Sequence, residues 1–143
     1  MAKHDWLTFA LAGSAVDAVI HASTVNTMEP ARDAHLKSPD FLDVEEYPTI
    51  TFKSKAVTTN GDRDLQVEGN LTIHGVTKEV LLKVEGPSRE EKDPLGNARI
   101  GASASTRIKR SDFGLGWNAA LETGGVLVGD NVKIEVEVSL IRV

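Results

Sequence analysis

Regular alternation of apolar and polar residues constrains the fold of this chain more than any other feature of its sequence. In residues 132–140, Val132, Ile134 and Val136 alternate with polar neighbours such as Lys133. The same two-residue period recurs in residues 16–22, 49–58, 65–74, 80–85 and 100–109. Successive side chains of a β-strand point to opposite faces of its sheet, so this period indicates strands with one buried face.

Short turn signals separate these segments along the chain. Asn60-Gly61 tolerates positive φ angles and favours a tight hairpin, and Gly75 marks a second reversal. Residues 86–97 contain several charges, two prolines and two glycines, which is typical of a solvated hairpin loop. We therefore expect about seven antiparallel strands. A chain of 143 residues suits one domain, so we expect a single domain over residues 1–143.

Helical signals are confined to two short stretches. Pro30 suits the first turn of a helix over residues 30–37, which Pro39 would close, and residues 111–121 offer another turn or two. Strands dominate the remaining pattern. The sequence therefore predicts an all-β, antiparallel barrel or sandwich with short helical insertions.

The charge and apolar content of the chain exclude several kinds of partner. The formal net charge is -5 at pH 7, whereas binding to nucleic acid depends on clustered positive charge, so we expect no nucleic-acid partner. No apolar run has the length of a membrane-spanning helix, so we expect a protein that does not span the membrane. Residues 6–12 are interpreted as a strand rather than an export signal, because Asp5 interrupts the basic flank. The expected compartment is the cytoplasm for the chain as given, or the periplasm if an export signal is missing from it.

Residues that carry catalysis or bind metals form no recognisable motif. The sequence has no cysteine, which excludes disulfides and thiolate chemistry. Its histidines, at positions 4, 21, 35 and 74, are far apart and match no metal-binding spacing. Nucleophile elbows, Walker loops and dinucleotide-binding glycine turns are also absent from the sequence. We therefore expect no enzyme activity, no catalytic residue, no metal and no cofactor.

A dense run of charged, aromatic and proline residues spans positions 32–52. It contains Arg-Asp-Ala-His-Leu at 32–36, Asp-Phe at 40–41 and Tyr-Pro-Thr-Ile-Thr-Phe at 47–52. Further motifs follow in order at residues 69–78, 92–97, 110–115 and 124–130. Together these motifs resemble the YceI-like family, and the resemblance extends from about Val16 to the carboxyl terminus. It implies an antiparallel lipocalin-like β-barrel that binds polyisoprenoid or related long-chain lipids.

The resemblance also suggests which residues meet such a lipid. Arg32, Asp33 and His35 look like a polar group at the mouth of the barrel that contacts the lipid head group. Their alternative role is to cap the short helix and anchor its loop to a neighbouring strand. The expected pocket wall is apolar and consists of Leu36, Phe41, Phe52, Leu71, Ile73, Ala102, Ala104, Phe113 and Trp117.

Small residues on the apolar faces suggest room inside the barrel. Gly69, Ala102, Ala104 and Ala22 stand among larger aliphatic residues, so a partly hollow interior is expected. Periodicity shows which face is buried but not whether a cavity exists, so a barrel filled by its own side chains stays open as an alternative.

The amino-terminal part departs from the family pattern. Members of the family usually begin with a further strand and a Gly-x-Phe strand, and residues 1–11 stand in their place here. We expect a domain shortened at this end, whose unpaired strand edges favour a homodimer. One alternative function is therefore a structural or interaction module that associates with itself through such an edge. Another is a hydrolase that uses His35 with Asp33, for which no nucleophile is apparent.

Overall fold

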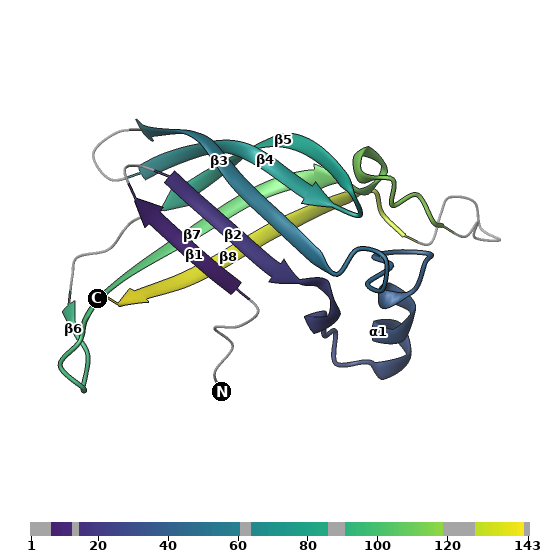
Figure 1. Cartoon of the computed structure of the whole chain (residues 1–143), viewed down its shortest axis with the longest axis horizontal. Coiled ribbons are helices and arrows are strands. Elements are labelled where there is room, and N and C mark those ends of the chain that lie inside the picture. Colours follow the sequence, from purple (N-terminus) through teal and green to yellow (C-terminus); the bar gives the residue numbers. More distant parts are fainter. Residues whose placement is uncertain (1–6, 13–14, 61–63, 86–90, 119–127, 142–143) are drawn as a thin grey trace.

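The computed structural model describes residues 7–12, 15–60, 64–85, 91–118 and 128–141, and within these ranges the chain forms one antiparallel sheet of eight strands (Figure 1). The strands are β1 (Leu7–Ala12), β2 (Ala15–His21), β3 (Thr49–Asn60), β4 (Asp64–Ile73), β5 (Val76–Glu85), β6 (Glu91–Lys92), β7 (Ala98–Lys109) and β8 (Asn131–Ile141). The helical segments are η1 (Ala22–Thr24), α1 (Pro30–Lys37) and η2 (Arg110–Phe113). The prediction of an all-β antiparallel fold with short helical insertions is confirmed.

Two boundaries differ from the sequence prediction. Part of the loop expected at residues 86–97 is the short strand β6, which pairs with β7. The Asp93 carboxylate makes this hairpin possible, because it accepts hydrogen bonds from the amides of Leu95 and Asn97, both at 2.9 Å, and so closes a tight turn. The helical turns expected at residues 111–121 are limited to η2, and residues 119–121 lie outside the described part of the chain.

The strands follow one another in the sheet almost in chain order. The order is β1-β2-β3-β4-β5-β7, and both β6 and β8 pair with β7. Residues opposite each other in adjacent strands point to the same face, so the register shows which residues share a face. Ala18 lies opposite Phe52, Phe52 opposite Leu71, and Val84 opposite Ala104. The apolar positions of all the long strands thus form one continuous inner face.

The sheet curls around this inner face (Figure 1). Its outermost strands are β1 and β8, and in the residues that the structure describes each of them pairs with a neighbour on one edge only. Within these residues, the edge of β1 that faces away from β2 and the edge of β8 that faces away from β7 pair with no strand.

Gly69 of β4 is a position where the absence of a side chain is required. A Cβ atom at this position would lie 2.6 Å from Cζ of Phe52 and 2.9 Å from Cα of Ser54. The register between β3 and β4 also shifts between Ser54 and Ala56, next to Gly69. Gly69 therefore does not leave empty space, as the sequence suggested, because the ring of Phe52 occupies it. Ala22 is likewise buried by its neighbours, with 4% of its surface exposed.

Candidate functional site

The inner face has a densely packed half at the end of the sheet near α1 and η2. Its core cluster consists of Phe52, Val67, Leu71, Ile73, Ile108, Phe113 and Leu115. Phe113 is only 1% exposed and Val67 only 2%. Phe113 belongs to η2, and η2 and α1 lie at the same end of the sheet in Figure 1. Packed side chains therefore close this end of the interior.

The inner face is more open farther along β7 and β8. Ala102 and Ala104 of β7 are half-buried, as are Val136 and Val138 of β8, which lie opposite them. None of these four residues belongs to the core cluster or to the partly buried residues that pack against it. Val84 of β5 lies opposite Ala104 and borders the same surface. This open apolar surface of β7 and β8 can therefore receive a ligand without displacing the core.

Thr27 connects the first turn of α1 to the loop that precedes the helix. The Asp33 carboxylate accepts hydrogen bonds from the amide of Thr27 at 2.8 Å and from its hydroxyl at 2.6 Å. The Arg32 guanidinium donates to the hydroxyl of Thr27 at 2.9 Å and to its carbonyl at 3.0 Å. The hydrogen bond from the Thr27 hydroxyl is the main reason why the pKa of Asp33 lies below its usual value. These contacts fit the anchoring alternative, with a loop residue as the partner rather than a neighbouring strand.

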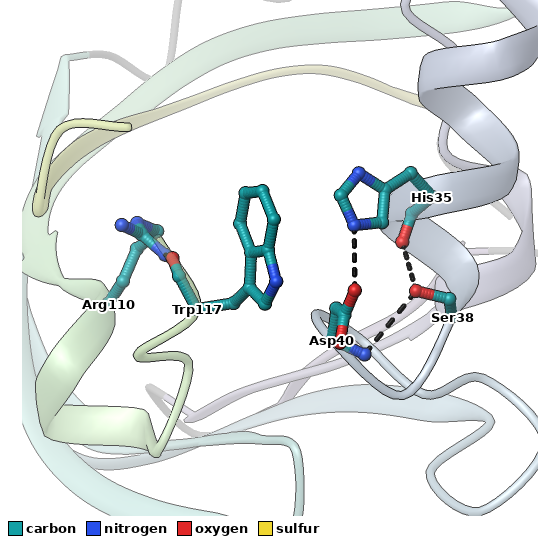
Figure 2. Close-up of polar contacts among 5 residues, drawn as sticks. All are labelled: His35, Ser38, Asp40, Arg110 and Trp117. Carbon is teal, nitrogen blue, oxygen red and sulfur yellow. Dashed lines mark hydrogen bonds and ion pairs between the residues drawn. The ribbon is translucent and has the colours of Figure 1, made fainter. Parts of the chain in front are cut away.

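His35 extends from α1 toward Trp117 and Asp40 (Figure 2). Its ring contacts Phe41 and Trp117 edge to face, with centroid distances of 5.0 and 4.7 Å. The Nε2 atom of His35 lies 2.9 Å from a carboxylate oxygen of Asp40, and the hydroxyl of Ser38 donates to the His35 carbonyl at 2.6 Å. His35 therefore joins α1 to an aromatic group at the closed end of the sheet.

Arg110 is a buried residue of this region that the sequence analysis did not single out. Its guanidinium donates to the carbonyl oxygens of Leu115 at 2.7 Å and Trp117 at 3.1 Å. On its other side the guanidinium donates to the carbonyl oxygens of Gly129 at 2.8 Å and Val128 at 3.3 Å. The Cζ atom of the Arg110 guanidinium also lies 5.9 Å from the centroid of the Phe41 ring. Arg110 thus holds together two stretches of backbone and positions Trp117 next to His35.

A signal for Arg110 was present in the sequence. The apolar positions of β7 are the even-numbered residues up to Ile108, so the same alternation places residue 110 on the inner side. A charged residue in a buried position of such a pattern indicates a polar network, because a buried charge must be compensated.

The predicted site residues therefore fall into separate groups. Arg32 and Asp33 are engaged with Thr27, whereas His35 contacts Phe41 and Trp117. Leu36 is half-buried in α1. The remaining wall residues divide between the packed half (Phe52, Leu71, Ile73 and Phe113) and the open surface (Ala102 and Ala104).

The described residues contain neither a cluster of metal ligands nor a membrane-spanning helix. No three histidine, aspartate or glutamate side chains come together in them as a metal site would require. Nor do they contain a helix with the length and apolar character to cross a membrane.

Comparison with known proteins identifies relatives of the whole sheet. The model of the YceI-like domain matches residues 4–140. The UPF0312 protein SA2479 of Staphylococcus aureus strain N315 is 43% identical over 119 residues, which cover 82% of this chain and 66% of that protein. The UPF0312 protein MW2606 of strain MW2 is 42% identical over the same coverage. The chain thus spans slightly less than two thirds of the length of these relatives.

Solved structures share the fold. The crystal structure of the YCEI protein of Campylobacter jejuni matches with a TM-score of 0.79 and 28% identity, over 95% of this chain and 80% of that one. BcnA of Burkholderia cenocepacia matches with a TM-score of 0.77 and 21% identity, over 94% and 82% of the two chains. The similarity to BcnA, at 21% identity, concerns the fold alone. The curled sheet is therefore of the lipocalin-like barrel type, as the family resemblance implied.

Proposed function

The chain belongs to the YceI-like family, and from this premise we propose that it binds a long-chain apolar lipid of the polyisoprenoid kind inside its curled sheet. The lipid is sequestered or carried, and no chemistry is performed on it. This function requires an apolar surface that the protein leaves free and does not require a nucleophile or a metal.

The observation that carries the proposal is the open apolar surface of β7 and β8. Ala102, Ala104, Val136 and Val138 share one face and stay half-exposed, although the neighbouring core is densely packed. Each methylene group that such a surface removes from water contributes about 0.8 kcal/mol. A long hydrocarbon chain is therefore held firmly by contact alone, and its affinity should rise with its length.

The other predicted site residues take supporting positions in this proposal. Phe52, Leu71, Ile73 and Phe113 form the closed end of the pocket, because they are buried in the core cluster. At the same end, Arg32 and Asp33 fix α1 through Thr27, and the half-buried His35 presents its ring beside Phe41 and Trp117. A direct contact of Arg32, Asp33 or His35 with a lipid head group stays a prediction.

Two polyprenols of different length test the proposal. Geranylgeraniol should bind more tightly than farnesol, because its extra isoprenoid unit buries more apolar surface. Ala104→Phe should weaken geranylgeraniol binding about tenfold, since the new ring occupies the space of about two methylene contacts. Titration calorimetry measures both effects, and mass spectrometry of lipids extracted from the purified protein identifies the natural ligand.

Ser105→Phe is the matched control for this variant. Ser105 is the next residue of β7 and points to the opposite face, so the same ring added there should leave the affinity unchanged. Equal affinities of Ala104→Phe and the unmodified protein, or a protein that binds neither polyprenol, would contradict a pocket on this face.

We also propose that the protein forms a homodimer through an outer edge of the sheet. The outer edges of β1 and β8 carry no strand pairing within the described residues, and an exposed edge is a template for pairing with another chain. Light scattering coupled to size-exclusion chromatography should give twice the mass of the chain. A monomeric mass over the whole accessible range of concentrations would exclude this assembly.

A further inference from the structure

A cleft opens in the wall of the sheet where β5 and β7 separate. Among the residues that the structure describes, the two strands pair only through Lys83, Val84 and Glu85 with Ser103, Ala104 and Ser105. Beyond these pairs η2 packs against both strands, and between them lies a cleft of about 620 Å³. Pockets that bind small molecules have volumes of about 300–1,000 Å³, so the cleft is large enough for a ligand.

The cleft joins an apolar floor to a basic rim. Val80, Ile108 and Phe113 line it, and Ile108 and Phe113 belong to the core cluster. Lys78, Arg107 and Lys109 line it as well, and all three are exposed. Lys78 lies opposite Leu71 in the register, so this lysine occupies a position on the otherwise apolar inner face.

Lys78 is the basic side chain of the cleft most available to an anion, because Arg107 and Lys109 also interact electrostatically with Glu135 and Asp130. Within the described part of the chain, none of the three makes a side-chain hydrogen bond or an ion pair. Of the two acidic residues in the lining, Glu79 is bound to Lys55 at 2.9 Å, which leaves Asp112. The cleft therefore has an excess of positive charge, although the chain as a whole carries a net charge of -5. Such a local excess selects an anionic partner.

A continuous apolar path leads from the cleft to the open surface of β7 and β8. Val80, Leu82 and Val84 are alternate residues of β5 on the inner face; each packs against the core cluster on one side and is half-buried, so part of its surface stays exposed. Val84 lies opposite Ala104, which belongs to the open surface. A hydrocarbon chain lying along this path would reach from the cleft to the alanines of β7.

We propose that the cleft between β5 and β7 binds the anionic head group of a single-chain amphiphile, with Lys78 as its main cationic contact. The apolar chain of this amphiphile lies along the inner face of β5 and reaches the open surface of β7 and β8. The inference rests on the proposed function and adds the chemical class of the ligand and the position of its head group. Carboxylate and phosphate share the chemistry that the basic rim recognises.

Three amphiphiles with the same chain of sixteen carbons test this inference. They are hexadecanoate, hexadecyl phosphate and uncharged hexadecan-1-ol, titrated into the full chain by calorimetry. Both anions should bind more tightly than the alcohol, and the stronger of the two identifies the preferred head group. Lys78→Glu should weaken anion binding by at least about fivefold, because it replaces an attraction by a repulsion, and should leave the alcohol unchanged.

Two further variants show which residue causes the preference for an anionic head group. Lys83→Glu makes the same charge change on β5 outside the cleft and should alter no affinity. The head-group position is overturned if Lys78→Glu and Lys83→Glu behave alike, or if His35→Ala rather than Lys78→Glu removes the preference for the anions. Binding of the alcohol as tight as that of the anions would also overturn it, while leaving the proposed function intact. Failure of all three amphiphiles to bind while geranylgeraniol binds would overturn this inference, whereas failure of geranylgeraniol as well would contradict the proposed function.

Discussion

Replacing Arg110 by glutamine is expected to lower the free energy of unfolding by about 3–5 kcal/mol. Arg110 is buried, with 8% of its surface exposed, and its guanidinium donates to four backbone carbonyls. Glutamine has one amide group and cannot reach both stretches of backbone. Each buried acceptor that loses its donor costs about 1–3 kcal/mol.

Arg110→Lys separates the role of the charge from that of the geometry. Lysine keeps the positive charge but lacks the planar fork that serves carbonyls on two sides, so this variant should also be destabilised, by about 1–3 kcal/mol. Arg107→Gln is the control, because Arg107 is an exposed residue near the end of β7, just before η2 and Arg110, and its effect should stay within about 0.5 kcal/mol. Urea unfolding measures all three values. A loss below about 1 kcal/mol for Arg110→Gln would show that the four carbonyls find other donors.

Phe113→Ala is expected to cost about 3–5 kcal/mol. Phe113 is among the largest fully buried side chains, it is 1% exposed, and it packs in the core cluster that closes one end of the interior. Removing the ring loses the free energy gained by transferring it out of water, and it leaves a cavity. The cavity cannot close fully, because the hydrogen bonds of Arg110, the first residue of η2, hold this segment in place.

Leu95→Ala is the matched control for Phe113→Ala. Leu95 is also a large apolar residue, but it is 85% exposed on the turn that follows β6, so its truncation should change the unfolding free energy by no more than about 0.5 kcal/mol. Both values come from the same urea titration. Equal effects of the two substitutions would contradict a packed core around Phe113.

The strands could be predicted because alternation is a local property of the sequence. Residues 132–140 show it clearly and lie within β8. The short strand β6 escaped prediction, since it depends on hydrogen bonds from the backbone to Asp93 and not on apolar spacing. The space at Gly69 was misjudged for a related reason. The sequence shows that a residue is small, but only the register shows that Phe52 lies against it.

The candidate site was less predictable, because it depends on contacts between distant segments. Alternation assigned Ala104 and Leu71 to the same face, yet Leu71 is buried in the core and Ala104 is half-exposed. Periodicity contains no information on this difference, which follows from what covers each residue. The family resemblance grouped Arg32 and His35 as one polar site, whereas α1 directs Arg32 to Thr27 and His35 to Trp117.

The order of the strands also has a consequence for how the chain acquires its structure. From β1 to β5 every strand pairs with the one that follows it in the chain, and β7 pairs with β8 in the same way. The pairs β1–β2, β3–β4 and β4–β5 close short loops, which carry a small entropic cost. Hairpins between strands that are adjacent in the chain form local contacts, which favour fast folding. The sheet can grow hairpin by hairpin from the amino-terminal side while the ribosome is still synthesising the rest.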